Sequence, residues 1–214
     1  MAVKQKCVEM VFAVFGKFIH DKHLSDKEKL AIETLAGVKY LQLFQKNGKV
    51  ESVCVDMGEP ILEPEKIPMY SDEQGSHHVK LTLGEKEFEF TGVSMGNPHA
   101  VTFVKEVSNF PVEKYGKIVE IDKHFPNRVN VEFVQIIDET HLKMRVWERG
   151  SAETMACGTG TCATVVASIL NGYTQRKVEV ELLGGILEIE WKKEDNHVYM
   201  KGPAVSVFEG YMEV

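Results

Sequence analysis

A cysteine followed at once by glycine-rich residues is the stretch of this sequence whose composition and spacing best suit chemistry. Cys157 precedes Gly158, Thr159 and Gly160, and the apolar run Ala163 to Leu170 follows. That run predicts a helix, and the glycines at its start would allow a ligand to approach the backbone. A helix N-terminus carries unpaired N–H groups and a partial positive charge, which bind anions and favour a thiolate over a thiol. The stretch could therefore cradle a carboxylate and place an acid/base thiol beside it, an arrangement suited to proton transfer at the carbon next to that carboxylate.

The other reading of Cys157 is a packing role, with the glycines serving only to bring the helix close to a sheet. Packing is the expectation for Cys162, which lies inside the apolar run, and for Cys54, which alternates with valines in a strand pattern. No two of the cysteines, Cys7 included, have the CxxC spacing of zinc or thioredoxin sites. We expect no disulfides in a cytosolic protein of this size.

Two further stretches place polar groups where loops meet strands. "MGNPHAV" puts Asn97 and His99 around a proline bend, and "WERGS" puts Glu148 and Arg149 at a strand end shortly before Cys157. An Asn-Pro turn and a solvated Glu-Arg pair are the structural alternatives. An arginine near an anion-binding helix end is nevertheless well suited to a second carboxylate.

The elements that must position these residues are one long apolar helix and many short strands. Alternating patterns predict antiparallel strands, and the turn signals include Gly37 and the pair Asn47-Gly48. The fold class is therefore α+β and not βαβ. Neither a GxGxxG fingerprint after a strand nor a P-loop lysine is present. We predict helices at 8–24 and 112–119, and a third helix that begins at the glycines after Cys157 and ends at 171–172. Strands are predicted within 30–58 and at 78–83, 86–95, 99–104, 128–137, 141–148, 178–183, 186–191 and 197–202. A loop is predicted at 61–78.

The composition limits the possible partners. The 214 residues are 43% hydrophobic and 27% charged, enough for one large domain or two small ones with a sizeable core. The net charge of -7 argues against nucleic acid as a partner. The apolar runs are too short to span a membrane, and the N-terminal stretch lacks the cleavage site of a signal peptide. We therefore predict a cytosolic protein.

Together these motifs resemble the diaminopimelate epimerase family. "GNPHAV", "RVNVEFV", "VWERGSAETMACGTGTCA" and "GPAVSVFEG" follow the family's order, and the match runs from about Phe15 to the end. The resemblance implies two similar lobes, each of antiparallel strands wrapped around a central helix. Residues 1–62 would be a remnant of the first lobe, 63–202 the complete second lobe, and 203–214 a return to the first.

The resemblance also implies a reaction: the interconversion of LL- and meso-diaminopimelate in lysine and cell-wall precursor synthesis, without pyridoxal phosphate or metal. Two cysteines, one from each lobe, would face opposite sides of the substrate α-carbon. Carried over by motif, Cys157 would be the second-lobe acid/base, and His99 would support it. Gly158 and Thr159 would hold the α-carboxylate. The residues that bind the rest of the substrate would be Asn97, Asn130, Glu148 and Arg149, with Glu148 also near the α-amino group. Phe208 would lie at a homodimer contact.

The chain departs from the family at its start. The first catalytic motif, Cys-Gly-Asn-Gly-x-Arg-Cys, is absent, and "MAVKQKCVEMVFAV" stands there instead. Synonymous codons for Met1 to Phe15 can be written that, read from the third base, encode Cys-Gly-Asn-Gly-Ile-Arg-Cys over the codons of Cys7 to Ala13. We hypothesise a frameshift just before Gly16, real or a sequencing error, with translation assigned from an internal Met1. The DNA sequence tests this directly.

With one catalytic thiol of two, we expect weak or no epimerase activity from this chain. Cys7 is the one candidate in this stretch for a substitute second thiol. A related cofactor-independent racemase, or a non-catalytic second lobe that binds an anion or pairs with another subunit, are the alternatives.

Overall fold

The computed structural model describes residues 9–34, 37–71, 75, 77–207 and 210. The chain divides into two compact units. The first unit is Met1–Asp56 with Lys201–Val214, and the second unit is Met57–Met200. The predicted site residues from Asn97 to Thr159 all belong to the second unit. Cys7 and Phe208 lie outside the described residues. The assignment of the units to a lobe remnant and a complete lobe stays a prediction.

The first unit places one helix on a small antiparallel sheet. Helix α1 (Glu9–Asp21) packs against β2, and β1 (Lys29–Thr34), β2 (Gly37–Lys46) and β3 (Lys49–Gly58) pair in order. The last two residues of β3 belong to the second unit. Asn47 and Gly48 both have positive φ, at 53° and 75°, as a two-residue hairpin turn requires. The hairpin predicted from this pair is confirmed.

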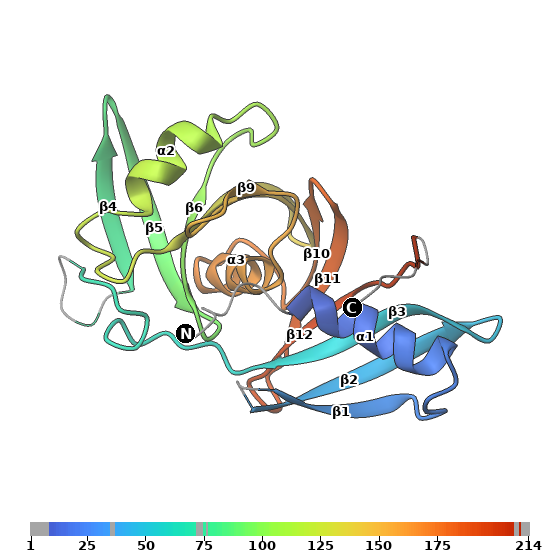
Figure 1. The fold of residues 1–214 in the computed structure, drawn as a ribbon. Helices are drawn as coiled ribbons and strands as arrows, with labels where there is room; N and C mark the ends of the chain where they lie inside the picture. Colours follow the sequence, from blue (N-terminus) through green and yellow to red (C-terminus); the bar gives the residue numbers. More distant parts are fainter. Residues whose placement is uncertain (1–8, 35–36, 72–74, 76, 208–209, 211–214) are drawn as a thin grey trace. The chain divides into compact units, whose positions relative to one another are not determined.

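The second unit wraps strands around the apolar helix that follows Cys157 (Figure 1). This helix, α3 (Gly158–Leu170), packs against β5, β6, β7 and β11, and its residues from Gly158 to Ser168 are all buried. A helix that is apolar on all sides needs such an enclosure. The sheet order is β12-β11-β10-β8-β7-β6-β5-β4, with β9 beside β8. The strands are β4 (His78–Leu83), β5 (Lys86–Ser94), β6 (Pro98–Phe103), β7 (Asn130–Asp138), β8 (His141–Glu148), β9 (Ala152–Thr154), β10 (Lys177–Leu182), β11 (Gly185–Trp191) and β12 (Val198–Pro203). Of these, β12 is divided between the two units.

Two strand pairs correct the sequence prediction of an antiparallel sheet. Strands β6 and β7 pair in parallel, as do β8 and β10. Helix α2 (Val112–Val119) connects the first pair and α3 connects the second, so each is a local strand–helix–strand crossover. Alternation of apolar and polar residues reports which face of a strand is buried, and it does not report the direction of the neighbouring strand. The α+β class is confirmed, while short β9 was not predicted.

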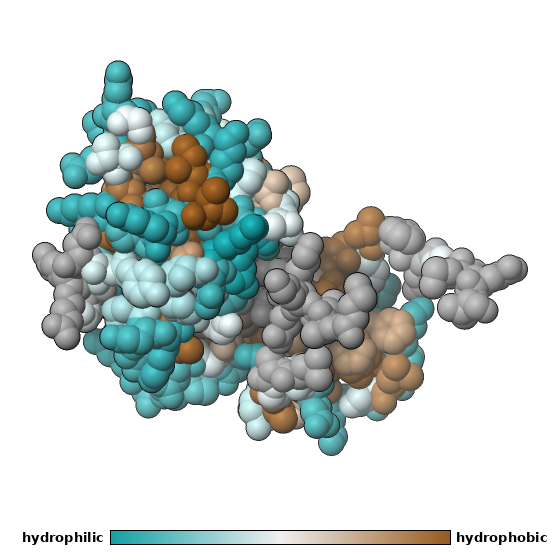
Figure 2. Space-filling model, turned by 60° about the vertical axis from the view of Figure 1, so that its left-hand side comes forward, coloured by the Kyte–Doolittle hydropathy of each residue, from teal (hydrophilic) through white to brown (hydrophobic). Residues whose placement is uncertain are grey.

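Figure 2 shows one face of the molecule, where hydrophilic residues cover much of the surface and apolar residues form separate areas. Large apolar side chains exposed in the second unit come from separate parts of the chain: Tyr70 and Ile121 lie in loops, and Ile186 lies on β11. Exposure of single apolar side chains is ordinary. Among the described residues, no helix is long and apolar enough to cross a membrane.

Candidate active site

Cys157 stands at the N-terminus of α3, as the sequence predicted. It is the N-cap residue, with extended φ and ψ of -135° and 112°. The first helical bond is donated by the N–H of Thr161 to the Cys157 carbonyl oxygen, at 2.9 Å. The N–H groups of Gly158, Thr159 and Gly160 therefore precede the helical ladder, at the positive end of the helix dipole. This turn has the geometry of an anion site with a thiol at its edge.

Gly160 lets this turn pack against a carboxylate. A Cβ at this position would lie 2.6 Å from Glu132 Oε1 and 3.3 Å from Cys157 Sγ. The Glu132 side chain is fully buried and held 2.7 Å from His99 Nδ1, so it has little room to yield. The glycine at this position is a steric requirement of the site.

We expect Gly160→Ala to lower the free energy of unfolding by about 2 kcal/mol, the usual cost of forcing extra volume into a packed interior. Urea unfolding followed by circular dichroism measures this change. The penalty should shrink when Glu132 is also replaced by alanine, because the carboxylate is the nearest obstacle. An undiminished penalty in that background would contradict the steric explanation.

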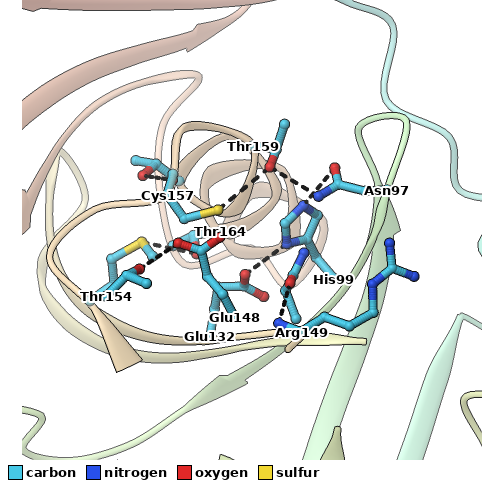
Figure 3. A network of polar contacts seen from close by, with 12 residues as sticks. Asn97, His99, Glu132, Glu148, Arg149, Thr154, Cys157, Thr159 and Thr164 are labelled. Carbon is cyan, nitrogen blue, oxygen red and sulfur yellow. Dashed lines mark hydrogen bonds and ion pairs between the residues drawn. The ribbon is translucent and has the colours of Figure 1, made fainter. Parts of the chain in front are cut away.

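A chain of polar contacts runs from the Cys157 sulfur into the protein interior (Figure 3). Cys157 Sγ lies 3.6 Å from Thr159 Oγ1, and Asn97 Nδ2 donates to that same hydroxyl oxygen at 3.3 Å. His99 Nε2 lies 3.1 Å from Asn97 Oδ1, and His99 Nδ1 lies 2.7 Å from Glu132 Oε1. His99 lies on β6, which begins at Pro98, directly after Asn97. Glu132 lies on the neighbouring strand β7. The sequence prediction named Asn97, His99 and Thr159, and the structure joins them in one chain.

Glu132 is the member of this chain that sequence reasoning missed. Burial raises its pKa, the contact with His99 opposes that rise, and the nearby Glu148 adds to it. The available signal was its position in "VNVEFV", where Asn130 and Glu132 share one face of an otherwise apolar strand. A carboxylate between buried positions is rarely left without a partner.

The raised pKa of Glu132 makes a prediction for stability. The folded state binds this proton more tightly than the unfolded state does. The stabilisation that this proton gives the folded state is therefore complete below the ordinary pKa of 4.5. It is lost as pH rises through the folded-state pKa. We expect Glu132→Gln, which cannot titrate, to become relatively more stable than the parent as pH rises above that ordinary value. Urea unfolding at a series of pH values measures this difference, and a difference that is constant with pH would contradict the assignment.

The remaining predicted residues lie at the ends of two strands of this sheet. Asn130 Oδ1 accepts the backbone N–H of Arg149 at 2.8 Å, and this bond ties the start of β7 to the turn after β8. The Thr154 hydroxyl donates to Glu148, whose carboxylate lies near Glu132 (Figure 3). The Arg149 guanidinium donates to the Asn127 carbonyl oxygen at 2.9 Å and lies on the far side of His99 from Cys157 in Figure 3. The site thus holds two carboxylates, Glu132 and Glu148, on the same side of His99 as the thiol, and one cation, Arg149, on the other side (Figure 3).

Comparison with known proteins identifies the family of the chain. The family model described as diaminopimelate epimerase matches residues 91–207. The diaminopimelate epimerase of Methanococcus maripaludis strain C5 is 53% identical over 199 residues, which are 93% of this chain and 72% of that protein. The chain belongs to the diaminopimelate epimerase family. The corresponding protein of Acetivibrio thermocellus is 55% identical over the same share of this chain and 71% of its own length. The chain is by family an isomerase, and the predicted resemblance is confirmed.

Solved structures support the fold. A hydroxyproline epimerase from Agrobacterium vitis matches with a TM-score of 0.63 and 12% identity, covering 88% of this chain and 61% of that one. A probable proline racemase from Agrobacterium radiobacter matches with a TM-score of 0.64 and 12% identity, over 90% and 63%. The chain spans less than two thirds of these two proteins. At such low identity the likeness concerns the fold alone.

Proposed function

We propose that this chain acts on diaminopimelate and that Cys157 is an acid/base at its α-carbon. The observation that carries the proposal is the position of Cys157 at the N-terminus of buried helix α3, next to an anion-binding turn. Gly158 and Thr159 would hold the α-carboxylate through their N–H groups. Asn97, Asn130, Glu148 and Arg149 would bind the rest of the substrate, with Glu148 near its α-amino group.

The proposed chemistry is a proton transfer without a cofactor. The Cys157 thiolate takes the α-proton, and the electron pair left on carbon delocalises into the carboxylate. Preorganised N–H donors at that carboxylate stabilise the developing charge most strongly in a site that excludes water. Return of a proton from the same sulfur retains the configuration, whereas inversion needs a second acid on the opposite face. The Cys7 thiol is the one candidate for that second acid in the N-terminal stretch.

The test is incubation of the purified chain with LL-diaminopimelate in deuterated water, followed by chiral separation and mass spectrometry. Deuterium uptake without inversion supports Cys157 acting alone, and uptake with inversion supports a second acid/base. Proline, offered in parallel, is the control substrate. No uptake into diaminopimelate, or uptake into proline instead, would overturn the proposal.

We also propose that the chain forms a homodimer and is located in the cytosol. Phe208 was predicted at the dimer contact, and Phe208→Ala is therefore expected to shift the chain toward the monomer. Sedimentation velocity of both proteins measures this, and equal sedimentation of the two would contradict the role of Phe208.

A further inference from the structure

Glu132 is a buried acid to which no step above gives a role. Its side chain is 0% exposed, and Oε2 has no hydrogen-bond partner among the described residues. Leaving a buried polar atom unpaired is costly, and such groups in folded proteins call for an explanation. The other oxygen, Oε1, meets His99 Nδ1 at 2.7 Å.

The contacts of Asn97 give the polar chain a direction. Its side-chain oxygen can only accept, so His99 Nε2, 3.1 Å away, must carry a hydrogen. His99 Nδ1 and Glu132 Oε1 then share one further proton between them. The Asn97 nitrogen donates to Thr159 Oγ1, which leaves the hydrogen of that hydroxyl available to point at the Cys157 sulfur, 3.6 Å away. In this direction the sulfur meets a donor, which favours the thiolate.

The opposite histidine tautomer would reverse the chain. If the Asn97 amide were turned over and His99 carried its hydrogen on Nδ1 only, His99 Nε2 would accept from the amide nitrogen. The Asn97 oxygen would then accept the Thr159 hydroxyl hydrogen, and the sulfur would meet an acceptor, which favours the thiol. The contact between His99 Nδ1 and Glu132 Oε1 holds a proton in both arrangements. The two differ in whether the Glu132–His99 pair holds a second proton, on Nε2, and that second proton decides which group faces the sulfur.

We propose that Glu132 is a positioning residue: by sharing a proton with His99 Nδ1 while Nε2 carries a second one, it holds His99 in the form that, through Asn97 and Thr159, aims a hydroxyl donor at the Cys157 sulfur. The inference rests on the proposed function only in giving Cys157 an acid/base role. Among the residues drawn in Figure 3, the other charged groups near these polar contacts are Glu148, the last residue of β8, and Arg149, which follows it. The negative charge of Glu148 disfavours a second anion at Glu132 and so favours the form of the Glu132–His99 pair that holds two protons.

The test measures the Cys157 thiol without substrate, so its outcome is independent of whether the chain turns over diaminopimelate. Cysteine labelled with ¹³C at Cβ is titrated by NMR, with the Cys157 signal assigned from Cys157→Ala. We expect Glu132→Leu to raise the Cys157 pKa by about one pH unit, the size expected for losing one hydrogen bond to the thiolate. Glu132→Gln, whose amide can donate to His99 Nδ1, should stay close to the parent.

A double-mutant cycle separates positioning from general damage. In a Thr159→Val background the hydroxyl is gone, and Glu132→Leu should have no further effect on the Cys157 pKa. Glu120→Gln is the matched control, because Glu120 is also buried but bonds Trp147 and Gly150 instead of His99. An equal shift from Glu120→Gln, an undiminished effect in the Thr159→Val background, or no effect of Glu132→Leu would each overturn the proposal.

A second readout remains if Glu132→Leu fails to fold. The ¹⁵N shifts of the His99 ring in the parent and in Glu132→Gln report directly which nitrogen carries the hydrogen. We expect protonated Nε2 in both proteins. A bare Nε2 with a protonated Nδ1 in the parent would overturn the proposal.

Discussion

Cys157→Ala abolishes the deuterium uptake at the α-carbon of diaminopimelate that we expect from the parent chain. The reason is that alanine has nearly the same size and cannot accept or return a proton. A positioned acid/base contributes rate factors of about 100 to 10,000, so we expect a loss of at least about 100-fold. Mass spectrometry of substrate incubated in deuterated water measures the rate.

Cys162→Ala is the matched control for this variant. Cys162 lies on the same buried helix and is itself fully buried, but the sequence and structure give it a packing position. We expect exchange to persist in Cys162→Ala, with a modest loss of stability from the smaller side chain. Equal exchange by Cys157→Ala and the parent would show that another group moves the proton.

Binding must be measured beside exchange, because a non-catalytic binding lobe is the competing explanation. Titration calorimetry with LL-diaminopimelate on Cys157→Ala reports whether the anion-binding turn still holds the ligand. Retained binding with lost exchange places the defect in proton transfer. Lost binding together with lost exchange would instead assign Cys157 a structural contribution to the site.

The helix after Cys157 and the hairpin at Asn47-Gly48 could be predicted because each depends on local chemistry. The apolar run can be satisfied only by burial on all sides, and the Asn-Gly pair tolerates positive φ. The predicted helix at 8–24 is observed as Glu9–Asp21, but its apolar residues do not share one fate: Phe12 is buried, whereas Phe15 and Phe18 are exposed. Spacing predicted the helix and could not tell which apolar side it buries.

Features that depend on partners distant in the sequence were not predictable in the same way. The parallel pairing of β6 with β7 follows from where α2 returns the chain, which the strand patterns do not encode. Glu132 lies 33 residues from His99, and its importance appears only when the two strands are adjacent. The motif resemblance identified the residues that would touch a substrate. It did not identify the buried acid behind them.

Gly116→Ala is expected to cause a large loss of stability in the second unit. A Cβ at Gly116 would lie 2.5 Å from both Cβ and Cγ of Trp147, and 3.0 Å from its Cδ2. Trp147 cannot easily move, because its indole N–H donates to Glu120 at 2.7 Å. We expect the free energy of unfolding to fall by about 3 kcal/mol, at the upper end for overpacking.

The sign of this change makes the test decisive. On an exposed helix the same substitution would stabilise the protein by up to about 1 kcal/mol, because alanine is the better helix former. Lys117→Ala, at an exposed position of the same helix, is the control and should change stability by less than about 0.5 kcal/mol. Thermal unfolding should show a drop of about 6–12 °C for Gly116→Ala, from the usual 2–4 °C per kcal/mol for a chain of this length. An unchanged or raised Tm would mean that α2 can move away from β8, and the close approach of Gly116 to Trp147 would then not be what fixes this helix on the sheet.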